Sequence, residues 1–216
     1  MRNRTMIVGI ILLFYFSSCK IYSEYAHILQ LQKNGMSEVQ LGVPRLERIE
    51  TATVVHLYGE PYEMGHQYGS LLKEHLISLT EIVRELFPEK AIQKYISIAQ
   101  QAEDNLSVSF REELQGMVDA SGVEYRYLLA LNLIPMVDCS VLAVWDEATP
   151  DGELIMGRNA DYLFGSINKA IGLIVVKHPR DGNATVMVSF LGMLGGFTGM
   201  NDQGVCYGNM LVHNSE

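Results

Sequence analysis

Apolar positions along the chain follow a helical pattern first and a strand pattern second. After Pro61 the apolar residues recur at intervals of three and four, which predicts an amphipathic helix that runs to Leu86 and ends before Pro88. Similar stretches predict three further helices, at about 90–104, 109–120 and 124–134. A β-branched run at 51–59, TATVVHLYG, predicts one strand ahead of the helices.

The pattern changes at about residue 137 to short strands joined by turns. CSVLAVW predicts a buried strand, DEATPDGE a turn around Pro-Asp-Gly, and LIMGRN the strand that returns. IGLIVVKH and ATVMVSFLG predict a second strand pair across the turn PRDGN, and GVCYGNMLVH predicts a last strand. A helical stretch followed by strands predicts an α+β fold.

The N-terminus has the composition of an export signal. Arg2 and Arg4 precede an uncharged apolar run at 6–16, and small residues follow that run. This order predicts a secretory signal peptide over 1–18, because a transmembrane helix needs about 20 apolar residues. An uncleaved membrane anchor is the alternative. Residues 19–50 are polar and mixed, which predicts a linker with little structure.

The end of this segment also bears on where the protein is located. FSSC resembles a bacterial lipoprotein cleavage site, with Cys19 as the lipidated residue. We therefore expect an exported protein. It is either a periplasmic or cell-surface lipoprotein with a lipid anchor to a membrane, or a secreted protein without one.

Composition and charge are those of an ordinary globular protein. The chain has 216 residues, of which 48% are hydrophobic and 19% charged, and this suffices for one sizeable core. The net charge of −9 argues against a nucleic-acid partner, because phosphate binding needs a basic surface. The cysteines Cys19, Cys139 and Cys206 are too few for a disulfide scaffold. No spacing of cysteines and histidines matches a metal site, so no metal is expected.

Cys139 is the candidate for chemistry, since a thiol is an effective nucleophile when it is ionised and correctly aimed. None of the six histidines forms a recognisable protease signature with it. A thiol that becomes N-terminal after backbone cleavage could instead use its own α-amine as base, with a pKa of about 7.7–8.0. Arg158 and Asp161 lie 19 and 22 residues further on, which suits a strand, a turn and a strand back. The alternative is a core cysteine near a surface ion pair.

Three motifs carry a resemblance to a known family. DCSVLAVW and DGELIMGRNADY together resemble the start of the catalytic chain in N-terminal-nucleophile (Ntn) hydrolases of the choloylglycine hydrolase and isopenicillin-N acyltransferase type. GEPYEMGHQYGSLLKEHL resembles the acyltransferase branch in particular, and GMNDQGVCYGN at 199–209 resembles a later strand of the same fold. The resemblance covers roughly 55–211. It implies a four-layer αββα sandwich, with a mainly helical N-terminal segment at 51–138 and the first part of the catalytic chain at 139–216.

The resemblance also implies roles for individual residues. Self-cleavage of the Asp138–Cys139 bond would expose Cys139 as the nucleophile, Arg158 would lie beside it, and Asp161 would hold the new amine. Asn209 matches the oxyanion-hole asparagine, with Asn201 as the second choice. The implied substrate is a small non-peptide amide, such as an N-acyl amino acid, a bile-salt-like compound or a penicillin-like compound, whose acyl group passes to water or to an amine. No organic cofactor is implied.

Two other interpretations stay open. Only 78 residues run from Cys139 to Glu216, which is short for two sheets and their outer helices, so an incomplete sandwich is expected. The chain would then be an inactive or fragmentary Ntn-scaffold lipoprotein with a binding role, or a second polypeptide or homo-oligomer would complete the fold. A papain-like protease is disfavoured, because its thiol would begin a helix rather than a strand.

Overall fold

The computed structural model describes residues 42–49, 52–133, 139–160 and 172–210. The predicted signal peptide, Cys19, Asp138 and Asp161 lie outside the described residues. The described chain belongs to two compact units, of which the larger holds the helices and a six-stranded sheet and the smaller holds one hairpin. The chain is therefore an α+β protein, as the sequence pattern predicted.

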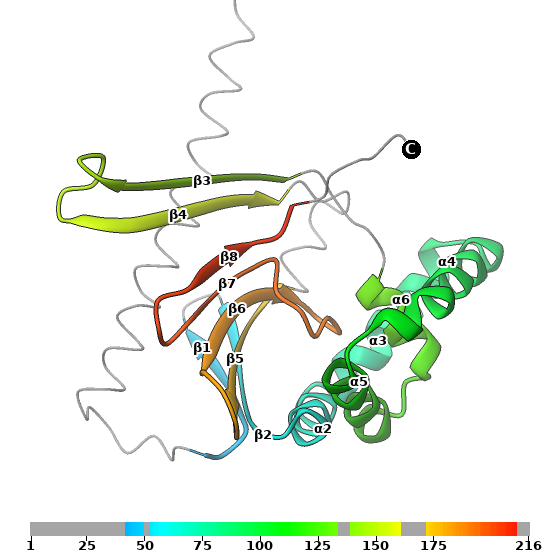
Figure 1. The fold of residues 1–216 in the computed structure, drawn as a ribbon. Coiled ribbons are helices and arrows are strands. Elements are labelled where there is room, and N and C mark those ends of the chain that lie inside the picture. Colours follow the sequence, from blue (N-terminus) through cyan, green and yellow to red (C-terminus); the bar gives the residue numbers. More distant parts are fainter. Residues whose placement is uncertain (1–41, 50–51, 134–138, 161–171, 211–216) are drawn as a thin grey trace, which may run out of the picture. The chain divides into compact units, whose positions relative to one another are not determined.

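The sheet of the larger unit combines strands from both halves of the chain (Figure 1). In spatial order its strands are β1 (Arg45–Ile49), β2 (Ala52–Gly59), β5 (Gly172–Pro179), β6 (Thr185–Phe190), β7 (Thr198–Asn201) and β8 (Cys206–Gly208). β2 and β5 run parallel, whereas the other neighbouring strands are antiparallel. Because β2 precedes residue 139 and β5 follows it, the predicted segments 51–138 and 139–216 share one sheet.

Two strands lie where none was predicted. β1 occupies part of the segment 19–50, which we expected to be a linker, and pairs with β2. Its sequence RLERI contains only two apolar residues, and they do not alternate regularly with polar ones, so the segment carries no strand pattern. β7 covers the stretch TGMN, which has few β-branched residues, and is held between β6 and β8.

The helices follow β2 and lie on one side of the six-stranded sheet (Figure 1). They are α2 (Pro61–Leu71), α3 (Lys73–Leu86), α4 (Glu89–Ala102), the short 3₁₀ helix η1 (Glu103–Asn105), α5 (Val108–Ser121) and α6 (Tyr125–Leu133). The single helix predicted over 61–86 is therefore wrong, since the chain breaks at Leu72, where φ is −116° and ψ is 17°. The Leu72 amide still donates to Tyr68 O at 3.0 Å, so this break is a kink that keeps both segments packed on the core.

The main core fills the space between these helices and the sheet. Val55 and Leu57 of β2 are fully buried against Tyr68 of α2 and Leu114 of α5. Residues of β2, β5 and β6 alternate between the two faces of the sheet, as strands require. The face away from the helices is also apolar and carries Val54, Ile174, Val176 and Val186. The helices pack on β2, β5 and β6 within the larger unit.

Helices α2 and α5 cross at glycines, with their backbones in contact. A Cβ atom at Gly65 would overlap the carbonyl group of Glu113, and one at Gly116 would overlap the carbonyl of Tyr62. Gly69, one turn after Gly65, lies against the carbonyl of Met117 in the same way. Backbone atoms cannot swing aside as a flexible side chain can, so these positions admit no side chain without moving the helices apart.

The smaller unit is the predicted hairpin of β3 (Cys139–Asp146) and β4 (Gly152–Ala160). A bulge between Val144 and Asp146 precedes the turn. Leu142 and Ile155 lie on one face and Met156 on the other, so both faces are apolar. We expected a buried strand, but Leu142 is 48% exposed, because two strands alone cannot cover either face of their own ladder.

Candidate functional site

The hairpin places Cys139 at the first residue of a strand, with the chain of Arg158 returning beside it. Cys139 is opposite Ala160, and Arg158 is opposite Val141, two residues along. Positions 139 and 158 therefore occupy the same face of the ladder as diagonal neighbours, which in a regular sheet are about 7–8 Å apart. Asp161 follows Ala160 directly in the sequence, but lies outside the described residues.

This register has a chemical consequence for a nucleophile at the start of the strand. Arg158 is half-buried, so part of its charge acts through protein rather than through water. A cation within about 4–6 Å of an amine lowers the pKa of that amine, because it disfavours a second positive charge. The backbone of the hairpin thus brings an arginine within reach of position 139.

The two asparagine candidates belong to the larger unit and differ in what they do there. The side-chain oxygen of Asn201 accepts hydrogen bonds from the amides of Gln203, at 3.1 Å, and Val205, at 2.9 Å. Asn201 therefore shapes the turn between β7 and β8. Asn209 follows β8, and its backbone amide donates to Phe197 O at 2.8 Å. The side chain of Asn201 is thus engaged by the turn.

A hydrogen-bonded loop, which we call the 191–197 loop, leads into β7, the strand that pairs with β8. The side-chain amide of Asn132 on α6 donates to Gly192 O at 2.8 Å, and its oxygen accepts from the amide of Leu194 at 2.8 Å. The hydroxyl of Tyr68 accepts from the amide of Gly192 at 2.9 Å. Sequence reasoning missed this loop support. Its one signal was Asn132 itself, a polar residue inside the apolar helix YRYLLALNL.

A buried ion pair ties the same region to α5. Lys177 Nζ lies 2.6 Å from Glu113 Oε1 and also donates to Leu194 O at 3.0 Å. Burial raises the pKa of the Glu113 carboxyl, while the Lys177 charge opposes that rise. The contact links β5, α5 and the 191–197 loop, so its role is to hold the larger unit together.

A second polar cluster lies at the β1, β2 and β5 strands. His56 is only 2% exposed, and its Nε2 lies 3.1 Å from Glu47 Oε2 and 3.3 Å from the guanidinium of Arg45. The ring of His178 stacks on that of Tyr58, with 4.5 Å between centroids. Burial, followed by the Arg45 charge, lowers the pKa of His56 to about 4, although Glu47 acts in the opposite direction.

This cluster predicts acid sensitivity of the fold. An unfolded histidine has a pKa of about 6.5, so the unfolded state binds a proton below that pH. Folded His56 binds this proton only near pH 4, so the unfolded state is favoured in between. The contribution of His56 to the free energy of unfolding is therefore fully present above about pH 6.5. It decreases by about 1–3 kcal/mol as the pH falls from 6.5 to 4. Urea unfolding at pH 7 and pH 5 measures this loss, and His56→Gln should reduce it. The exposed His75→Gln should not; an equal loss in both variants would exclude His56 as the source.

The comparisons with known proteins leave the activity undetermined. No family model matches the chain. It is 31% identical to protein dcd1B of Dictyostelium discoideum over 196 residues, which cover 75% of this chain and 39% of that protein. An uncharacterized protein of Archaeoglobus fulgidus is 28% identical over 74% of this chain and 32% of its own length. Dictyostelium protein dcd1A is 27% identical over 71% of this chain and 43% of its own length. The chain thus spans less than half the length of the curated relatives it matches.

Metal clusters and membrane-spanning helices are both absent from the part of the chain that the structure describes. No three metal-ligating side chains in residues 42–49, 52–133, 139–160 and 172–210 gather closely enough to hold an ion. Within the same ranges, no helix combines the length and apolar character that crossing a membrane requires.

Proposed function

We propose that the chain is an autoprocessing cysteine Ntn hydrolase or acyltransferase that acts on C–N amide bonds of small, non-peptide N-acyl substrates. The observation that carries this proposal is the hairpin register. Position 139 begins a strand, and the return strand brings Arg158 to the same face and ends one residue before Asp161. If Arg158 and Asp161 formed only a surface ion pair at the end of the hairpin, a cysteine at the first residue of the strand would have no role.

Each residue has a defined role in the proposed reaction. The α-amine of Cys139, set free by cleavage, takes the proton from Sγ, and the thiolate attacks the amide carbonyl. Arg158 keeps that amine neutral, and Asp161 holds and orients it. Asn209 and a backbone amide hold the oxyanion, for which one donor contributes about 2.7–4 kcal/mol in other enzymes. The amine of the substrate leaves with the proton, and water or a second amine then takes the acyl group from sulfur.

The apolar faces of the two units support a four-layer αββα arrangement. The six-stranded sheet carries apolar residues on the face away from the helices, and the hairpin carries them on both faces. A sheet with two apolar faces needs a layer on each side. We also propose export, with Cys19 as a lipid anchor if the chain is a lipoprotein.

Intact mass spectrometry tests the self-processing step. We expect the purified chain, incubated at neutral pH, to give two masses under denaturing conditions, split before Cys139. The fragments should still elute together from a native sizing column, because β2 on one fragment pairs with β5 on the other. A single full-length mass after incubation would reject self-processing and favour a binding role on the same scaffold.

The role of Arg158 in turnover can be tested by comparing its substitution with that of another arginine of the chain. Arg158→Ala should lower the turnover of N-acyl amino acids by about 10²-fold or more, since a displaced pKa removes the general base at neutral pH. Arg180→Ala is the matched control, because Arg180 is an exposed arginine that lies 3.0 Å from Glu63. Asp161→Asn should show a loss similar to that of Arg158→Ala. Turnover within twofold of the unchanged chain would remove the substituted residue from the site.

A further inference from the structure

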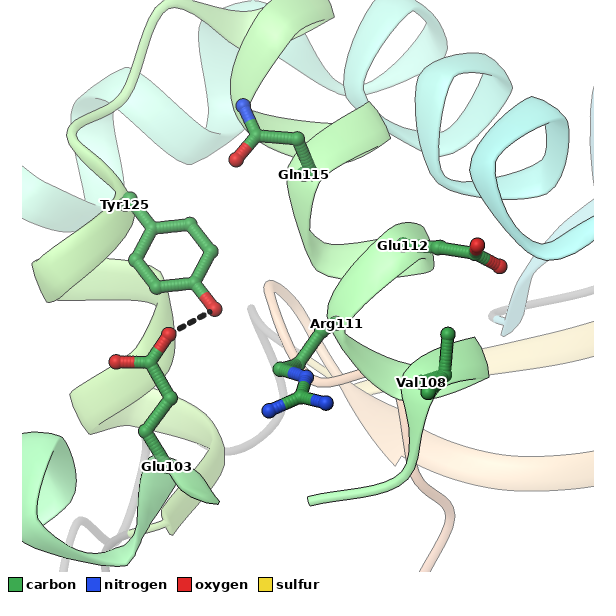
Figure 2. A pocket seen from close by; sticks show the side chains of 6 residues that line it. All are labelled: Glu103, Val108, Arg111, Glu112, Gln115 and Tyr125. Carbon is green, nitrogen blue, oxygen red and sulfur yellow. Dashed lines mark hydrogen bonds between the residues drawn. The ribbon is translucent and has the colours of Figure 1, made fainter. Parts of the chain in front are cut away.

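A pocket of about 450 Å³ opens on the helices of the larger unit, where η1, α5 and the start of α6 meet (Figure 2). Its lining consists of Glu103, Val108, Arg111, Glu112, Gln115 and Tyr125. The pocket therefore holds one cation and two carboxylates, together with an amide, a phenol and an aliphatic side chain. None of these residues takes part in the proposed reaction of Cys139, so what the pocket binds is a separate question.

Arg111 is the feature that points to a ligand. Three other arginines of this unit are paired: Arg84 with Glu124 at 3.5 Å, Arg126 with Glu124 at 2.9 Å and Arg180 with Glu63 at 3.0 Å. Arg111 is half-buried, yet its guanidinium group has no ion pair or hydrogen bond to any residue that the structure describes. Figure 2 shows its guanidinium group projecting into the open space beside Glu103 and Tyr125. A half-buried guanidinium in this position is suited to a carboxylate, which it can bind through two parallel hydrogen bonds.

The acidic side of the pocket is held in place. The hydroxyl of Tyr125 donates to Glu103 Oε1 at 2.7 Å. Burial and this hydrogen bond raise the pKa of Tyr125 to about 12, so the phenol remains a donor over the physiological range. The bond fixes the Glu103 carboxylate, whose second oxygen, Oε2, has no partner within the described part of the chain. An acceptor fixed in this way can receive a hydrogen bond from an ammonium group.

We propose that this pocket binds a small zwitterion, an α-amino acid with an apolar side chain. Its carboxylate would pair with Arg111, and its ammonium group with Glu103 Oε2. The side chain would lie against Val108, which is 62% exposed at the rim. A ligand with a carboxylate alone would face two carboxylates and one cation, so the charges favour a ligand that carries both signs. The inference stands independently of the proposed enzymatic activity.

Isothermal titration of the full chain with L-leucine tests the proposal. Two matched probes each lack one charge: 4-methylpentanoate has no amino group, and 3-methylbutylamine has no carboxylate. We expect L-leucine to bind at least about tenfold more tightly than either probe, the loss that corresponds to removing one charge-assisted contact. If 4-methylpentanoate binds as tightly as L-leucine, or if L-leucine does not bind at about 20 mM, the proposal is wrong.

Substitutions locate the binding within the pocket. Arg111→Gln and Glu103→Gln should each weaken L-leucine binding at least about tenfold. In Glu103→Gln the amide oxygen can still accept from Tyr125, so the pocket keeps its shape. Arg84→Gln is the control, because Arg84 is paired with Glu124 outside the pocket. Circular dichroism verifies folding, and Arg111→Lys replaces Arg111→Gln if the latter is unfolded. Binding by the Arg111 variant within twofold of the unchanged chain would overturn the proposal.

Discussion

A chain carrying Cys139→Ala is expected to remain a single polypeptide and to turn over no N-acyl amino acid above the rate in buffer. In the proposed reaction the Cys139 thiol acts twice. It first attacks the Asp138 carbonyl, and the peptide C–N bond breaks as the thioester forms, which frees the α-amine. Water then hydrolyses the thioester and sets the thiol free again. It then attacks the substrate with that amine as base. Alanine removes the nucleophile from both steps, so cleavage and turnover should be lost together, as measured by denaturing mass spectrometry and an amine-release assay.

Two further variants distinguish the loss of the Cys139 nucleophile from effects that any cysteine substitution could have. Cys139→Ser keeps a weaker nucleophile at the same position, so we expect slow cleavage and a large loss of turnover. Cys206→Ala is the matched control, since Cys206 is a half-buried thiol of the larger unit, whose Sγ lies 3.8 Å from Gly204 O. It should cleave and turn over substrate normally. Cleavage of the Cys139→Ala chain would show that another group performs the first step.

The sequence predicted local structure better than the pairing of distant strands. The helices from residue 89 onward end within two residues of the predicted positions, because their apolar spacing is a local property. The hairpin was predicted from its turn residues for the same reason. The parallel pairing of β2 with β5 was not predicted, since it joins Val54 to Ile174 across more than half the chain. The kink at Leu72 was missed because the apolar spacing continues through it.

The candidate site was predictable to a similar extent. The spacing between Cys139 and Arg158 suited a hairpin, and the observed register places them two residues apart along the ladder. The partners of Asn132 and His56 could not be predicted, because each depends on a segment outside its own helix or strand. Asn132 contacts Gly192 of the 191–197 loop, 60 residues further on, and periodicity carries no information about such a contact.

The crossing of α2 and α5 should lose stability when a methyl group is added at Gly65. In an exposed helix, replacing glycine with alanine stabilises by about 1 kcal/mol. At Gly65 the new Cβ would overlap the backbone carbonyl of Glu113, which cannot move without displacing α5. We therefore expect Gly65→Ala to lower the free energy of unfolding by about 2–4 kcal/mol, against the trend of helix propensity. Urea denaturation followed by far-ultraviolet circular dichroism measures the change.

The control and a second substitution make this prediction specific to the crossing. A Cβ atom at Gly195 would meet no heavy atom of the described residues within 4 Å, so Gly195→Ala should change stability by less than about 0.5 kcal/mol. Gly116→Ala should resemble Gly65→Ala, because its Cβ would overlap the Tyr62 carbonyl from the other helix. Once one methyl group has separated the helices, the second should cost less, so the double variant should lose less than the sum. A gain of about 1 kcal/mol in Gly65→Ala, the amount that helix propensity alone supplies, would mean that the two backbones are not in contact there.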